Sequence, residues 1–122
     1  MVAIRLLVSN TQLALDFYHG LLGFEIVEQW GPAFAIIERD GVTVWVSGPG
    51  TSAQQELADG QQPEPGGWNR LVLAVASLSE TLAVLAEKGY FPLVDPVKGP
   101  GGTQALISDG VGNVVEIFEE NA

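Results

Sequence analysis

The stretch GGTQALISDGVGNVVEIFE (Gly101–Glu119) contains two runs of β-forming residues separated by a short turn rich in glycine. The first run is Gln104–Ser108, the turn is Asp109–Asn113, and the second run is Val114–Phe118. Two β-forming runs joined by a short segment of Asp, Gly and Asn are typical of a β-hairpin. The sequence therefore predicts a pair of antiparallel strands here.

The second run of this hairpin carries one charged residue, Glu116. Because side chains alternate between the two faces of a strand, Val115 and Ile117 share one face. Val114, Glu116 and Phe118 share the other. The first face is predicted to pack in the core. The second face places a charge in an otherwise apolar strand, which predicts that it lines either water or a pocket.

The size and composition of the chain predict one folded domain spanning residues 1–122. Hydrophobic residues make up 47% of the 122 residues, which is enough for a core. No apolar run approaches the roughly 20 residues of a membrane span, and the first residues do not resemble a signal peptide. We therefore expect a cytoplasmic protein without a membrane partner. The absence of cysteine excludes disulfides, thiolate chemistry and zinc–cysteine sites.

The charge balance is strongly acidic, with 15 acidic residues against five basic ones and a formal net charge of -10. A chain with this charge repels phosphate backbones, so no nucleic-acid partner is expected. The same field could attract a cationic ligand. The alternative interpretation is that the surplus acid only keeps the protein soluble.

The first part of the sequence predicts a strand, a helix and three further strands. Ser9 and Gln12 have the spacing of a capping box that opens the helix, and Gly23 is predicted to end it. Asp40-Gly41 predicts a tight turn between the last two strands. The strands are predicted at Val2–Val8, Phe24–Gln29, Phe34–Glu38 and Val42–Ser47. The buried helix stripe is predicted to be Leu13, Ala14, Phe17, Tyr18, Leu21 and Leu22.

The segment Gly48–Gly67 is rich in Gly, Pro, Gln and Ser and predicts a linker with one short helix near Gln54–Ala58. The order of elements then repeats. The predictions are a strand at Trp68–Val75, a helix between Ser77 and Gly89, a short strand at Phe91–Val94, and the hairpin. Equivalent positions lie at nearly constant separations: Ser9 and Ser77, Gly23 and Gly89, Trp45 and Glu116. This predicts two βαβββ modules, at residues 1–47 and 68–122, joined by a linker at 48–67.

Two segments resemble a known family. LDFYHGLLGFEIVE (Leu15–Glu28) and DGVGNVVEIFEE (Asp109–Glu120) are similar to the glyoxalase/bleomycin resistance protein/dioxygenase group, the vicinal oxygen chelate superfamily. The resemblance covers essentially the whole chain and implies an α+β fold, in which two βαβββ modules form half-open barrels around a cleft. It also implies a homodimer with clefts shared across the interface.

The resemblance places the metal-ligand positions of the family at Ala3, Trp45, Arg70 and Glu116. Only Glu116 has a side chain that can bind a metal ion. Because catalytic metal sites typically use about three protein ligands, we predict no metal and no cofactor. The only histidine, His19, is predicted to have a solvated or helix-terminal role.

Arg70 and Glu116 map to positions that the family brings together, so we predict that the guanidinium pairs with the carboxylate inside the cleft. The alternative is an exposed pair at the barrel mouth that stabilises the fold by less than about 1 kcal/mol. If the protein is catalytic, Glu116 is the only strong candidate for the catalytic residue.

Aromatic residues provide the other candidates for ligand binding. Trp45 alternates with buried-type valines and is predicted to point into the cleft, whereas Trp30 and Phe34 flank a Gly-Pro turn. Such residues line pockets for planar or cationic organic molecules. Arg5, the one charge in the first strand, is a further candidate for ligand binding. The alternative is that the tryptophans fill the core or a dimer interface.

Three functions follow from these predictions. The first is a metal-free protein of the bleomycin-resistance type, acting in antibiotic resistance by binding a small organic ligand, aromatic or cationic, in a dimer cleft. The second is a metal- or Glu116-dependent lyase, dioxygenase or isomerase of the same superfamily. The third is a structural or regulatory dimer whose cleft is closed by Trp45. We predict the first.

Overall fold

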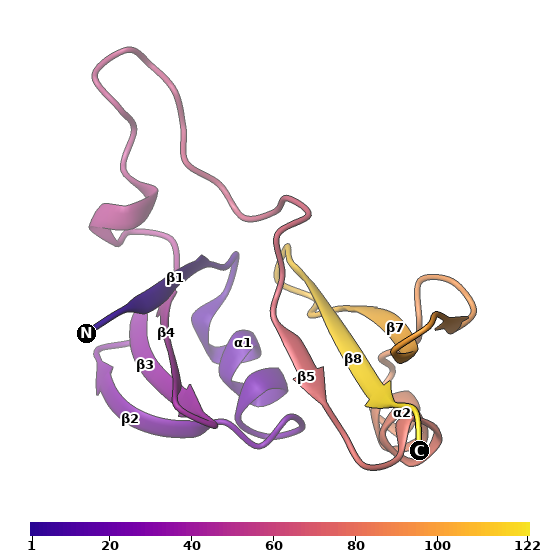
Figure 1. The fold of residues 1–122 in the computed structure, drawn as a ribbon. Helices are drawn as coiled ribbons and strands as arrows, with labels where there is room; N and C mark the ends of the chain where they lie inside the picture. The colour runs from indigo at the N-terminus through magenta and orange to yellow at the C-terminus, as the bar shows by residue number, and fades with distance from the viewer. The chain divides into compact units, whose positions relative to one another are not determined.

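The computed structural model describes residues 1–122, which separate by their contacts into two compact units. The N-terminal unit comprises residues 1–66 and 110–112, and the C-terminal unit comprises residues 67–109 and 113–122. Each unit contains one four-stranded mixed sheet and one α-helix (Figure 1). None of the helices combines the length and the apolar character that crossing a membrane requires.

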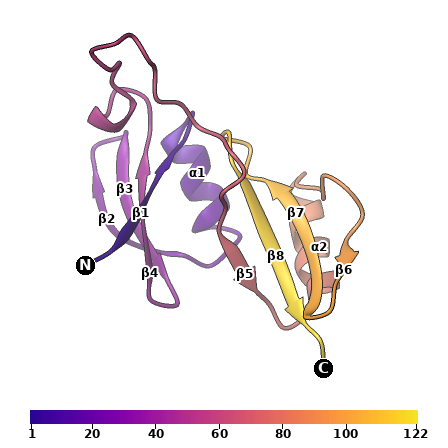
Figure 2. The same cartoon turned by 45° about the horizontal axis from the view of Figure 1, so that its top comes forward.

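The N-terminal unit has the predicted order of strand, helix and three strands. Its sheet has the strand order β1-β4-β3-β2, with β1 parallel to β4 and the other two pairs antiparallel. α1 covers one face of this sheet (Figures 1 and 2). The elements are β1 (Ala3–Leu7), α1 (Thr11–Tyr18), β2 (Glu25–Trp30), β3 (Phe34–Arg39) and β4 (Val42–Ser47).

The core of the N-terminal unit lies between α1 and this face of the sheet. The stripe that α1 buries differs from the predicted one, since Leu15 is buried and Leu13 is 50% exposed. The hydroxyl of Thr11 donates to the backbone O of Ala33 at 2.7 Å, which turns the Thr11 and Leu15 side of the helix inward. The fully buried residues between helix and sheet are Ala14, Phe17, Tyr18, Ala35, Ile37, Val44 and Val46.

Both predicted ends of α1 are displaced. Asn10, and not Ser9, is the N-cap, because its Oδ1 accepts the backbone N–H of Leu13 at 2.9 Å. Ser9 instead donates its backbone N–H to the O of Val111 at 3.0 Å. The helix ends at Tyr18 and not at Gly23. Gly23, with a φ of +74°, changes the direction of the chain after one further turn.

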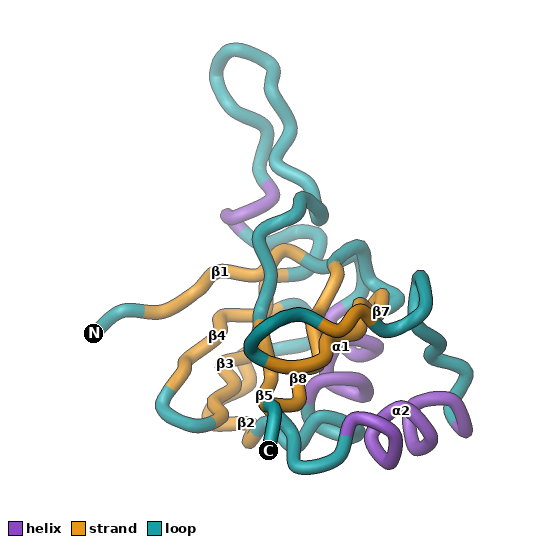
Figure 3. Tube along the Cα trace, turned by 45° about the vertical axis from the view of Figure 1, so that its right-hand side comes forward, coloured by secondary structure: helices purple, strands orange, loops and turns teal.

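The linker is fixed to the N-terminal sheet at its start. Its only helical turn is η1 (Ser52–Gln54), which lies earlier than the predicted Gln54–Ala58. The side-chain amide of Gln54 donates to the backbone O of Val8 at 2.8 Å and of Ser47 at 2.9 Å, which ties η1 to the ends of β1 and β4. After η1 the chain continues as a long loop without regular structure (Figure 3).

The C-terminal unit repeats the architecture of the first. Its strand order is β5-β8-β7-β6, with β5 parallel to β8. α2 begins as predicted, with the hydroxyl of Ser77 accepting the backbone N–H of Glu80 at 3.2 Å, and Gly89 follows its end at a φ of +87°. The elements are β5 (Val72–Ala74), α2 (Leu78–Glu87), β6 (Val97–Lys98), β7 (Gly102–Ser108) and β8 (Val114–Glu120).

Two predicted strands of this unit were wrong in extent or place. β5 is three residues long and begins at Val72, so the first part of Trp68–Val75 is not strand. Phe91–Val94 is not a strand, and only Pro92 forms an isolated bridge, to Ile107. Proline has no backbone N–H to donate, so the pairing in this region falls instead at Val97–Lys98.

Gly102 lies where β7 passes very close to β8. A Cβ at this position would be 2.2 Å from the backbone O of Glu119 and 2.7 Å from the ring of Phe118. We expect Gly102→Ala to lower the free energy of unfolding by about 1–2 kcal/mol, because the strand end must shift to admit the methyl group. The measurement is urea unfolding, with Gly101→Ala as the control, since the nearest atom there is 3.9 Å away. Equal losses in both variants would contradict this explanation.

Candidate functional site

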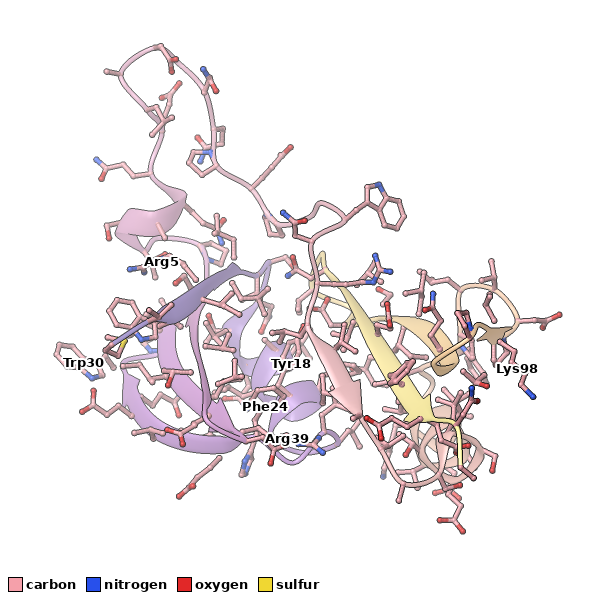
Figure 4. The ribbon with its side chains drawn as sticks, viewed as in Figure 1. Arg5, Tyr18, Phe24, Trp30, Arg39 and Lys98 are labelled. Carbon is pink, nitrogen blue, oxygen red and sulfur yellow. The ribbon has the colours of Figure 1, made fainter.

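An aromatic strip crosses the face of the N-terminal sheet that α1 does not cover. We define it as Trp30, Phe34 and Trp45, together with Arg5 at one end. In the strand register Arg5 on β1 lies opposite Trp45 on β4, and Phe34 on β3 lies opposite Trp30 on β2. Figure 4 shows Arg5 and Trp30 on this side of the sheet, away from Tyr18 and Phe24. The strip therefore runs across all four strands.

Arg5 and Trp45 form the centre of the strip. The guanidinium carbon of Arg5 lies 5.0 Å from the centroid of the Trp45 ring, a cation–π contact. The Nη1 of Arg5 also donates to the hydroxyl of Ser47 at 3.2 Å. Arg5 is exposed, whereas Trp45 is half-buried. The guanidinium of Arg5 therefore covers the Trp45 ring, and the Trp45 side chain leaves this face of the sheet open.

Two further aromatic rings extend the strip toward β2. Phe34 meets Trp45 edge to face, with ring centroids 6.0 Å apart and an interplanar angle of 87°. Trp30 is 67% exposed, and its Nε1 donates to Oε2 of Glu28 at 2.9 Å. These contacts orient the rings, and the exposed ring of Trp30 leaves apolar surface open to solvent.

The C-terminal unit carries the second group of predicted site residues. The Nε and Nη2 of Arg70 donate to Oε1 of Glu116 at 3.1 and 2.9 Å, so the predicted pairing is confirmed. The side chains are 25% and 11% exposed, which makes this a partly buried pair and not an exposed one. The Nη1 of Arg70 donates to the backbone O of Trp68 at 3.1 Å, which fixes the third nitrogen of the guanidinium.

The two units place different residues at equivalent positions of their sheets. Arg5 lies opposite Trp45 in the first unit, and Val72 lies opposite Glu116 in the second. Ala3 lies opposite Thr43, and Arg70 precedes β5 by two residues. The repeat therefore keeps the register of its first and last strands and changes the chemistry of the side chains.

The residues at the predicted metal-ligand positions do not fit a metal ion. They offer a methyl group, an indole, a guanidinium and one carboxylate, and the carboxylate already accepts two bonds from Arg70. No three His, Cys, Asp or Glu side chains gather in the chain as a metal site needs. His19 lies at the end of α1, with Nδ1 2.7 Å from the backbone O of Phe24, in a helix-terminal position as predicted.

The predicted site residues thus fall into two groups, each within one unit. Arg5, Trp30, Phe34 and Trp45 form the aromatic strip, and Arg70 and Glu116 form the ion pair. Two acceptors were not predicted from the sequence: the hydroxyl of Ser47, which accepts from Arg5, and the backbone O of Trp68, which accepts from Arg70. A backbone acceptor carries no signal in the sequence. Ser47 could have been found from its place next to Trp45 on the same face of β4.

Comparisons with known proteins give a family and a set of similar folds. The family model described as Glyoxalase/Bleomycin resistance protein/Dioxygenase superfamily matches residues 1–117 of the chain. A member of this superfamily from Sphaerobacter thermophilus is 28% identical, with a TM-score of 0.70 and coverage of 98% of each chain. The comparison with curated protein sequences returns no match.

Two solved structures with lower identity share the fold. TnmS3, an antibiotic-binding protein from Streptomyces, is 22% identical, with a TM-score of 0.70 and coverage of 99% of this chain and 98% of its own. Lactoylglutathione lyase from Agrobacterium tumefaciens is 16% identical, with a TM-score of 0.76 and coverage of 98% and 92%. The α+β fold of two βαβββ modules is therefore the fold of a binding protein and of an enzyme.

Proposed function

Because the chain belongs to the Glyoxalase/Bleomycin resistance protein/Dioxygenase superfamily, we propose that it is a metal-free binding protein for a small organic molecule with an aromatic or cationic group. The observation that carries this proposal is the aromatic strip, in which Arg5, Trp45 and Phe34 are held in fixed mutual orientations on an open sheet face. Oriented rings beside a charged group are what a site for a planar organic molecule requires. The antibiotic-binding neighbour supports an antibiotic-like ligand, and the bleomycin resistance proteins in the family's description support a role in resistance.

The ion pair supports binding over catalysis. A catalytic base needs a carboxylate oxygen that is available to take a proton, and Oε1 of Glu116 already accepts from two nitrogens of Arg70. The alternative, a lyase, dioxygenase or isomerase that depends on a metal or on Glu116, predicts a stoichiometric divalent metal or turnover that is lost in Glu116→Gln. Elemental analysis of protein purified without chelators separates the two functions, and stoichiometric nickel, zinc, iron or manganese would overturn the proposal.

The direct test uses calorimetric titration with 2-naphthol, a planar molecule that is neutral at pH 7. We expect Trp30→Val to weaken binding about tenfold or more, since the exposed Trp30 ring is free to stack on the ligand and such stacking contributes roughly 1–3 kcal/mol. Valine keeps a side chain suited to a strand, so the sheet should survive the change. Chelator treatment should leave the affinity of the parent protein unchanged.

Trp68→Val is the matched control for this titration. Trp68 is 73% exposed and lies in the C-terminal unit, outside the strip. Its replacement should change the affinity for 2-naphthol by less than about twofold. If both tryptophan variants bind like the parent protein, the strip is not the binding surface, and if the parent protein itself does not bind 2-naphthol, the proposal in this form is wrong.

We propose further that the ligand site lies in a cleft of a homodimer. The support for this is the family resemblance, together with exposed apolar side chains on the edge strands β2 and β6, at Val27 and Val97. Light scattering after size-exclusion chromatography measures the mass directly. A monomer at the concentration used for the titrations would contradict a site shared between two copies.

A further inference from the structure

Arg5 differs from the other arginines in having no acidic partner. Arg39 lies 3.2 Å from Asp40 and Arg70 lies 2.9 Å from Glu116, whereas no carboxylate lies within 4 Å of Arg5. Lys88 and Lys98 also have no carboxylate within 4 Å, but neither lies over an aromatic ring as Arg5 does. An unpaired guanidinium on an aromatic face is therefore a feature that needs its own explanation.

The guanidinium of Arg5 retains free donors. Its one hydrogen bond is from Nη1 to the hydroxyl of Ser47, so Nε and Nη2 make none. Because Arg5 is exposed, both nitrogens can reach a ligand. A planar guanidinium with two neighbouring free N–H groups matches the two oxygens of a carboxylate, and such charge-assisted pairs are about twice as strong as neutral hydrogen bonds.

The same residue disfavours a cationic ligand at Trp45. The guanidinium stands 5.0 Å from the ring centroid, which is where a ligand cation would have to lie to use that ring. A second positive charge would have to displace Arg5 or approach it against repulsion. The Trp45 end of the strip therefore suits an anionic group.

The remaining charges on this face favour one orientation of the bound ligand. Glu28 lies at the β2 end of the strip, where its carboxylate accepts from Trp30. Glu38 lies opposite Thr43 on the face that carries Trp45, and Glu25 lies opposite Glu38. All three carboxylates would repel an anion on the β2 and β3 side of the face. Since neighbouring strands are about 4.8 Å apart, the strip from β1 to β2 covers about 14 Å, which is room for one or two fused rings and a carboxylate.

We propose that the ligand is a planar aromatic carboxylate, whose rings lie on Phe34 and Trp30 and whose carboxylate is bound by Nε and Nη2 of Arg5. This proposal rests on the proposed function and narrows its ligand class. The acidic net charge does not oppose it, because charges farther than about 8 Å are largely screened at physiological ionic strength. Arg5 then acts as the residue that selects the ligand by its charge.

The test is calorimetric titration of the full chain with three probes of nearly equal size: 2-naphthoate, its neutral amide 2-naphthamide, and the cation 2-naphthylmethylammonium. We expect 2-naphthoate to bind about tenfold tighter than the amide, and the cation to bind most weakly. Arg5→Met keeps the unbranched side chain without its charge and should remove the preference. Arg5→Lys keeps the charge without the planar fork and should retain only part of it.

Lys98→Met is the matched control, because it removes one positive charge from an exposed position in the C-terminal unit. It should leave the preference within about twofold, which separates a local effect of Arg5 from an effect of net charge. Thermal unfolding of each variant shows that the fold is retained. Equal binding of 2-naphthoate and 2-naphthamide by the parent protein, or a preference that persists in Arg5→Met, overturns this inference and leaves the proposed function standing. Failure of all three probes to bind overturns both.

Discussion

Phe17→Ala is expected to lower the free energy of unfolding by about 3–5 kcal/mol, the largest loss for any single substitution considered for this protein. Phe17 is completely buried in the core of the N-terminal unit and packs edge to face against Tyr18, with ring centroids 5.0 Å apart. Tyr18 in turn packs against Phe24 at 5.7 Å. Removing the first ring leaves a cavity beside two rings that cannot collapse into it without losing their own contacts.

The measurement is equilibrium unfolding in urea, followed by circular dichroism. Leu13→Ala is the matched control, because it shortens a large apolar side chain on the same helix that is 50% exposed. The control should lose less than about 1 kcal/mol, since little area leaves the core. A loss in Phe17→Ala no larger than the loss in the control would show that the core of this unit does not lie where the structure places it.

Glu116→Gln is expected to lower the free energy of unfolding by about 2–3 kcal/mol. The amide keeps the shape of the carboxylate but removes its charge, which leaves the partly buried guanidinium of Arg70 without a counterion. Arg70→Met should be similarly destabilising, because the unpaired group is then the carboxylate. The double variant Arg70→Met/Glu116→Gln should recover part of the loss, since neither side then carries an unpaired charge.

Asp40→Asn provides the exposed counterpart of this experiment. Asp40 pairs with Arg39 at 3.2 Å, but its side chain is 85% exposed. An exposed pair contributes about 0–1 kcal/mol, and asparagine tolerates the φ of +51° at this turn position, so the loss should be small. If Glu116→Gln and Asp40→Asn lose equal amounts, the burial of the Arg70–Glu116 pair adds nothing to its contribution.

Sequence patterns predicted the repeated architecture because each of the decisive signals is local. The Asp109–Asn113 turn lies between two strongly β-forming runs, and the structure has β7 and β8 on either side of it. Asp40 and Gly41 have φ values of +51° and +80°, which is the conformation that the Asp-Gly pair predicts. Residues of these types encode their conformation without help from distant contacts.

The predicted element boundaries were wrong where a contact with a residue distant in the sequence decides them. Ser9 and Asn10 are both good N-cap residues, and the choice of Asn10 accompanies a backbone bond from Ser9 to Val111, which is far away in the sequence. The inward side of α1 is likewise accompanied by a bond from Thr11 to the backbone O of Ala33. Neither contact can be predicted from the spacing of apolar residues within the helix.

The candidate site was predicted residue by residue, but its contacts were predicted only in part. The Arg70–Glu116 pair followed from the family resemblance, since both residues map to positions that the family brings together. The contact between Arg5 and Trp45 was not predicted, because it depends on the parallel register of β1 against β4. A parallel pairing of two strands that are far apart in the sequence fixes its register through the packing of the whole sheet.

Residues 110–112 belong to the N-terminal unit, and this affects how the chain folds during its synthesis. Val111 is completely buried there, and its backbone O accepts from Ser9. While the ribosome is still adding the second half of the chain, the first half has no residue to fill that place. Its final packing must wait until Val111 has left the exit tunnel, so the N-terminal unit completes its fold only after most of the C-terminal unit has been synthesised.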